Sequence, residues 1–100
     1  MSVKLLMRWD ILKGKESEYS EFVVNDFIPR CKRLGLAEMQ FWYTAFGTCE
    51  QIQASGKADD LGKMETIMSS EEWSNLLSLL DDYVTEFSLK VIRSEPGFQL

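Results

Sequence analysis

Histidine is absent from this chain of 100 residues. Its absence excludes catalytic triads with a histidine base, haem held by histidine, and the commonest ligand of protein-bound metals. The sequence also has no phosphate-binding P-loop, no glycine-rich dinucleotide motif and no pair of cysteines separated by two residues. Because no conventional active-site signature is present, any activity must come from side chains that line one face of the fold.

Cysteine and positive charge are scarce as well. Cys31 and Cys49 lie far apart in the sequence, so we expect reduced thiols in a cytoplasmic protein. The formal net charge of −5 argues against nucleic acid and anionic membranes as partners, because phosphate groups need a basic surface. The first residues lack the pattern of a signal peptide, and no apolar run approaches the length of a membrane span.

Acidic residues occur in adjacent pairs at Asp59-Asp60, Glu71-Glu72 and Asp81-Asp82. These pairs are more typical of solvated helix ends than of a carboxylate metal site, so we expect neither a metal nor another cofactor. Hydrophobic residues make up 45% of the chain, which is typical of a folded globular protein. We expect a single domain over residues 1–100, with an ordered core over about 3–93 and a tail over 94–100.

Hydrophobic alternation is clearest at residues 3–11, which predict a strand. An apolar stripe at helical spacing then predicts a helix over 15–34, which Pro29 kinks or divides and Gly35 ends in a left-handed cap. The remaining predicted elements are strands over 36–46, 50–57 and 84–93, a tight reversal at Gly47-Thr48, a short helix capped by Asp59 or Asp60, and a helix opened by a capping box of Ser69 and Glu72.

This order, β-α-β-β-α-α-β, predicts an α+β fold with a four-stranded antiparallel sheet and helices on one face. Two segments carry a family resemblance: ASGKADDLGKM, which leads from the third strand into a helix, and SSEEWSNLLSLLDDYVTEFSLKVIRS, which closes the domain. The chain resembles the dimeric α/β-barrel superfamily of ferredoxin-like domains, which includes antibiotic-biosynthesis monooxygenases, muconolactone isomerases and NIPSNAP-like proteins. The resemblance implies a homodimer in which two sheets form one barrel with the helices outside.

The two faces of the predicted sheet differ in composition. The face under the helices is predicted to carry Val3, Leu5, Met7, Trp9, Ala37, Met39, Phe41, Tyr43, Phe87, Leu89 and Val91. The opposite face is predicted to carry Leu6, Arg8, Asp10, Glu38, Gln40, Trp42, Thr44, Phe46, Glu86, Ser88, Lys90 and Ile92, joined by Gln51, Gln53 and Ser55 if the hairpin register holds. Large apolar groups beside a few polar ones are typical of a covered cavity or an interface, so we expect a second subunit to cover this opposite face.

Six residues of the opposite face are the candidate ligand-binding residues: Arg8, Asp10, Glu38, Gln40, Trp42 and Lys90. Arg8 can hold a carboxylate or enolate oxygen and Lys90 can add positive potential, whereas Glu38 or Asp10 can accept a proton if burial raises its pKa. The alternative is structural: Arg8, Glu38, Glu86 and Lys90 neutralise one another as cross-strand ion pairs.

Two functions remain open. In the first, a homodimeric barrel holds a small, partly apolar organic molecule and acts, if it is an enzyme, as a cofactor-independent monooxygenase, cyclase or isomerase. In the second, the chain is a non-catalytic binding or assembly module whose barrel interior is filled by its own side chains. Members of the superfamily that degrade haem often place a histidine near the cavity, so the lack of histidine argues against that reaction. No catalytic residue is identified from the sequence.

Overall fold

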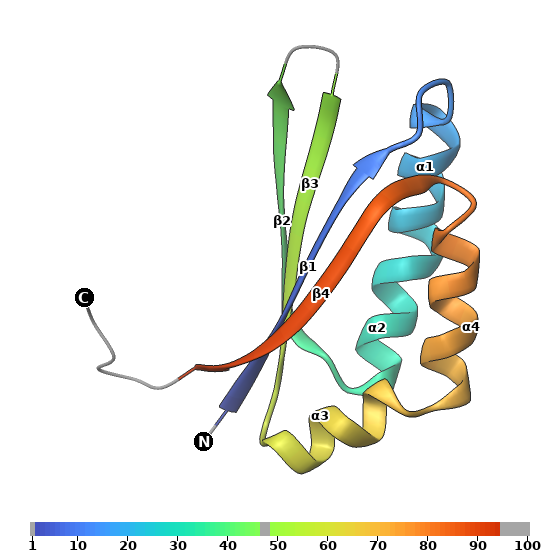
Figure 1. Cartoon of the computed structure of the whole chain (residues 1–100). Helices are drawn as coiled ribbons and strands as arrows, with labels where there is room; N and C mark the ends of the chain where they lie inside the picture. The colour runs from blue at the N-terminus through green and yellow to red at the C-terminus, as the bar shows by residue number, and fades with distance from the viewer. Residues whose placement is uncertain (1, 47–48, 95–100) are drawn as a thin grey trace.

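The structure is a computed structural model and describes residues 2–46 and 49–94. Four strands form one sheet in the order β2-β3-β1-β4, and every neighbouring pair is antiparallel. All helices lie on the same side of this sheet (Figure 1), which confirms the predicted α+β fold. The elements in chain order are β1 (Ser2–Ile11), α1 (Glu16–Phe22), a π-helical turn η1 (Val23–Phe27), α2 (Ile28–Leu34), β2 (Ala37–Phe46), β3 (Cys49–Ala58), α3 (Leu61–Met68), α4 (Glu71–Leu80) and β4 (Val84–Ser94).

The long first helix is confirmed, but it contains one wide turn. In η1 the N–H of Ile28 donates to the carbonyl of Val23, five residues back. Pro29 follows in the first turn of α2, and it has no N–H to donate to the carbonyl of the preceding turn. Pro29 therefore interrupts the regular helix as predicted. Gly35 ends α2 with a φ of 112°, the predicted left-handed cap.

The caps of the two shorter helices were predicted with mixed success. Asp60 opens α3, and its side-chain oxygen accepts a hydrogen bond from the N–H of Lys63 at 2.8 Å, as predicted. The capping box of Ser69 and Glu72 is wrong by one residue, because Ser70 opens α4 and accepts from the N–H of Trp73 at 3.2 Å. The hydroxyl of Ser69 instead donates back into the last turn of α3.

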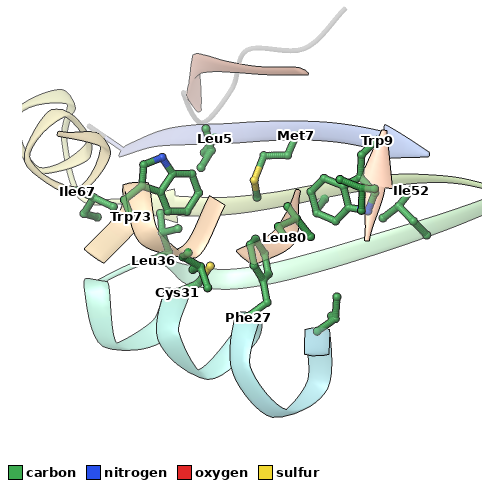
Figure 2. Close-up of a cluster of buried hydrophobic side chains, with 14 of the residues drawn as sticks. Leu5, Met7, Trp9, Phe27, Cys31, Leu36, Ile52, Ile67, Trp73 and Leu80 are labelled. Carbon is green, nitrogen blue, oxygen red and sulfur yellow. The ribbon is translucent and has the colours of Figure 1, made fainter. Parts of the chain in front are cut away.

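The core lies between the sheet and the helices, and Trp9 is one of its largest side chains (Figure 2). Trp9 is fully buried, and its Nε1–H donates to the hydroxyl of Tyr19 at 2.9 Å. The rings of Phe27 and Phe41 meet it edge-on, and that of Phe87 stacks on it at 6.0 Å between centroids. Other buried members of this cluster come from β1, β3, the helices and the link between α2 and β2: Val3, Leu5, Met7, Phe22, Val23, Cys31, Leu36, Ile52, Ala54, Met64, Ile67, Trp73, Leu76 and Leu80.

A bulge near the start of β2 changes the face of one predicted core residue. Ala37 lies opposite Lys57 and Gln40 lies opposite Ser55, so β2 uses one residue more than β3 between these pairs. Glu38 occupies the bulge with a φ of 50°. Ala37 was predicted to face the helices, but the extra residue places it on the other side, where it is exposed.

A second bulge, in β4, changes the residue that lies on the open face opposite Asp10. Arg8 of β1 lies opposite Ser88, but Asp10 lies opposite Thr85, and Glu86 adopts a φ of 58° between them. Thr85 therefore shares a face with Asp10, whereas strict alternation had placed Glu86 there. β4 continues to Ser94, one residue beyond the predicted strand.

The hairpin between β2 and β3 has the predicted face assignment for β3. Gln51, Gln53 and Ser55 lie opposite Asp10, Arg8 and Leu6 respectively, on the side away from the helices. The predicted reversal at Gly47-Thr48 and the side chains of Phe46 and Cys49 lie outside the described residues. Within the described ranges, no helix has the length and apolarity to cross a membrane.

Candidate ligand site on the open face of the sheet

The side of the sheet away from the helices is called here the open face. Most of its described residues fall into four rows, each running across the strands in the order β2, β3, β1, β4. By register these rows are Ala37-Lys57-Lys4-Ile92, Gln40-Ser55-Leu6-Lys90, Trp42-Gln53-Arg8-Ser88 and Thr44-Gln51-Asp10-Thr85. Each of the two central rows has one large apolar side chain (Leu6 or Trp42) and one cation (Lys90 or Arg8) among uncharged polar side chains.

A hollow of about 430 Å³ lies over the two central rows. Trp42 of the edge strand β2 lies at one side and Lys90 of the other edge strand, β4, at the other. Its volume is in the range of small-molecule sites. The lining residues are Leu6, Met7, Arg8, Trp42, Gln53, Ala54, Ser88, Leu89 and Lys90.

Arg8 projects from the middle of β1, and its guanidinium is hydrogen-bonded to Gln51 of the neighbouring row. With its carboxamide oxygen turned toward Arg8, Gln51 accepts hydrogen bonds from Nε at 3.3 Å and from Nη2 at 3.1 Å. A neutral amide fixes the plane of the guanidinium without cancelling its charge. Nη1 is not used by this pair of bonds, so an edge of the guanidinium remains for a ligand oxygen.

Three of the six candidate residues come together at the hollow: Arg8, Trp42 and Lys90. Lys90 lies opposite Leu6, so it is the diagonal neighbour of Arg8 across the β1–β4 pair. Diagonal neighbours on antiparallel strands are about 7–8 Å apart, which is within reach of two long side chains directed at one small anion. The sheet therefore brings two cations and one indole ring to the same hollow.

Asp10 and Gln40 do not line the hollow. Asp10 lies in the outer row, between Gln51 and Thr85. Gln40 lies at the β2 edge of a central row, beside Ser55, which is 1% exposed although it belongs to the open face.

Glu38 lies farther away, because the bulge in β2 places it beyond the central rows. Its carboxylate is 3.3 Å from Nζ of Lys57, at the end of the sheet. The alternative in which Arg8, Glu38, Glu86 and Lys90 neutralise one another is therefore not observed. Over residues 2–46 and 49–94, no ion pair within 4.0 Å joins any two of these four side chains.

Trp42 and Tyr43 are neighbours on β2 and lie on opposite faces of the sheet. Trp42 is 49% exposed on the open face. Tyr43 was predicted to lie under the helices, and its register opposite Ile52 agrees, but 58% of it is exposed. β2 is an edge strand, and here it extends past the cover that the helices give to Phe41.

The buried titratable groups lie on the helix side and take no part in the hollow. Burial raises the pKa of the Cys31 thiol to about 12, and the cationic neighbours in its sequence do not lower it. Burial likewise raises the pKa of Tyr19 to about 12, against a smaller lowering effect of its hydrogen bond with Trp9. A thiol with such a pKa stays protonated at neutral pH and is a poor nucleophile.

Sequence reasoning had placed Gln53, Ser88 and Leu6 on this face but had not included them in the site. The sequence contains the signal that could have identified them, because Leu6 is two residues from Arg8 on the same strand and the strand alternation puts Gln53 and Ser88 on the same face. The contact between Gln51 and Arg8 had no signal in one sequence, because it depends on the hairpin register. In the described ranges, no group of three or more acidic or cysteine side chains is placed to hold a metal ion.

No protein-family model and no curated protein matches the sequence significantly. Solved structures do match. SnoaB, a cofactor-independent oxygenase from Streptomyces nogalater, superposes with a TM-score of 0.74 at 9% identity, covering 99% of this chain and 98% of its own. A NIPSNAP domain protein from Burkholderia xenovorans has a TM-score of 0.68 at 14% identity and covers 100% of both chains.

A third structure is a dimeric protein of unknown function from Bacteroides fragilis, described as having a ferredoxin-like fold. It has a TM-score of 0.64 at 12% identity, covering 93% of this chain and 96% of its own. This chain has the ferredoxin-like fold. The predicted resemblance to the monooxygenase and NIPSNAP-like group is confirmed as a likeness of fold.

Proposed function

We propose that two copies of this chain pack their open faces together into one barrel, and that the hollow becomes a cavity for a small, partly apolar organic molecule. The observation that carries the proposal is the composition of the open face. Trp42 is 49% exposed and Ile92 40% exposed on it, beside the half-buried Leu6. Contiguous apolar side chains on a surface mark an interaction or ligand site.

A second copy is the cover that the comparisons favour. The ferredoxin-like protein from Bacteroides fragilis is described as dimeric. A two-fold interface uses the same surface on both subunits, so one sheet face with mixed apolar and polar groups can cover itself. Both open faces would then bury their Trp42 and Ile92 side chains in the same assembly.

For the chemistry, we propose a cofactor-independent monooxygenase, cyclase or isomerase whose substrate supplies the reactivity through its own acidity. The support comes from SnoaB, which is described as a cofactor-independent oxygenase. The hollow also offers hydrogen-bond donors from Arg8, Gln53 and Ser88 to an oxygen of such a substrate. The competing function, a module with a filled interior, differs in one property: its barrel has no space for a ligand.

The test of the assembly is a charge placed on the open face. Trp42→Lys puts a second ammonium group where the partner's face must pack, so it should convert the dimer into a monomer. The matched control is Val24→Lys, because Val24 is also an exposed apolar residue (66%) but lies on the helix layer. Light scattering coupled to size-exclusion chromatography measures both masses.

The proposed assembly requires the two variants to differ. Trp42→Lys should elute as a folded monomer with an unchanged far-ultraviolet circular dichroism spectrum, whereas Val24→Lys should keep the mass of the unmodified protein. Equal masses for the two variants would mean that the open face is not the interface.

A further inference from the structure

The charges around the hollow are unlike those of the chain as a whole. The chain has a formal net charge of −5, yet the charged residues that line the hollow are Arg8 and Lys90. No described carboxylate oxygen lies within 4.0 Å of either cation. The hollow on the open face is therefore positively charged.

Two acidic candidates from the sequence, Glu38 and Asp10, leave this charge uncompensated. Glu38 is held by Lys57 at the end of the sheet, 3.3 Å from its ammonium group. Asp10 lies in the outer row, and the guanidinium of Arg8 bonds to the neutral Gln51 of that row. The arrangement fixes the direction of the Arg8 side chain while keeping its positive charge.

Covering the open face adds a desolvation cost for the two cations. Cations removed from water must be paired and hydrogen-bonded, or the enclosed state is destabilised. A two-fold partner brings the same two cations into the interior, since the interface uses one surface twice. The enclosed barrel therefore needs anions, and the hollow at Arg8 and Lys90 is where they fit.

We infer that the hollow selects an anion: a molecule with a flat apolar body and an acidic oxygen group, such as an aromatic carboxylate, sulfonate or enolate. The acidic group binds between Arg8 and Lys90, and the apolar body lies against Trp42 and Leu6. The inference deepens the proposed function and rests on it, because it requires the hollow to be an enclosed ligand site.

The test compares two fluorescent probes that share one aromatic body. Anilinonaphthalene sulfonate carries an anionic group, and N-phenylnaphthylamine is the same ring system without it. The sulfonate should bind to the native protein about tenfold more tightly or better, since hydrogen bonds to charged groups contribute more than neutral ones. Fluorescence titration gives both affinities, and sedimentation confirms that each sample keeps its oligomeric state.

Variants assign the preference to the hollow. Arg8→Gln and Lys90→Gln should each reduce the preference for the sulfonate, and the double variant should remove it while N-phenylnaphthylamine binds as before. The matched control is Arg33→Gln, because Arg33 is an exposed arginine of α2 that lines a different surface hollow. That substitution should leave both affinities unchanged.

The possible results distinguish a failure of the anion site from a failure of the proposed cavity. Equal affinities for the two probes, or a sulfonate preference that survives in the double variant, would overturn the anion site and leave the cavity proposal intact. Equal affinities would result if Asp10 of the second copy paired with these cations across the dimer. A dimer that binds neither probe would have a filled interior, and the cavity proposal would fail together with the anion site.

Discussion

The helix-covered face and the open face of the sheet are made from alternate residues of the same strands, and their side chains differ in burial and charge. On β1, Trp9 is fully buried under the helices with its one polar atom bonded to Tyr19. Its neighbour Arg8 is exposed on the open face with its charge uncompensated by any described carboxylate. The comparison teaches that the helices cover the sheet on one side only: the covered face explains stability, and the open face is the one that we propose for binding.

The sharpest way to break this comparison is to truncate a tryptophan on each face. Trp9→Ala removes the centre of the aromatic cluster and leaves a cavity, so it should lower the free energy of unfolding by about 3–5 kcal/mol. Trp42→Ala, studied at a concentration where the chain is monomeric, should cost much less, because Trp42 is half exposed. Urea unfolding measures both; similar losses would contradict the division of roles between the faces.

The amount that the sequence could reveal follows from this division. Strands and helices were predictable wherever an apolar face had to be buried, because burial enforces a period of two or of about 3.6 residues. The strand of Trp9 and the helix stripe of Tyr19 and Phe27 are of this kind. Pro29 and Gly35 were predictable for a different reason, since each restricts the backbone by its own covalent structure.

The bulges could not be predicted, and the one in β2 places the candidate Glu38 away from the hollow. Glu38 and Glu86 both have positive φ values although neither is glycine, so composition gives no warning of either. Strict alternation carried through these positions assigns Ala37 and Glu86 to faces where the register does not place them. The cap at Ser70 was missed for a simpler reason, because two adjacent serines offer the same side chain.

High pH should lower the stability of the covered face, because Cys31 and Tyr19 are buried there as neutral acids. The pKa of Cys31 and that of Tyr19 are each about 12 in the folded protein, so the folded state keeps these protons to higher pH than the unfolded state does. Their contribution to stability is complete below about pH 9 and is lost as the pH rises toward 12. The free energy of unfolding should therefore fall over this window, as measured by urea unfolding at a series of pH values.

The control for this titration is the double variant Cys31→Ala, Tyr19→Phe, which is less stable at neutral pH but has neither ionisable group. Its free energy of unfolding should fall less steeply between pH 9 and 12 than that of the unmodified protein. Parallel slopes would mean that these two buried groups do not control alkaline stability.

A smaller effect is expected at the helix caps that hold the cover in place. Asp60→Ala removes the acceptor for the N–H of Lys63 and should lower the free energy of unfolding by about 1 kcal/mol. Ser70→Ala should cost a similar amount at the start of α4. Ser69→Ala is the matched control, because its hydroxyl donates to the end of α3 and opens no helix; thermal unfolding midpoints should rank it as the mildest of the three.

The most direct test of the central claim is the mass of the unmodified protein by sedimentation equilibrium over a range of concentrations. If a second copy covers the open face, the data should fit a dimer of twice the 11.6 kDa chain mass at micromolar concentration. A mass of 11.6 kDa at every concentration would leave Trp42 and Ile92 in solvent and would contradict the account.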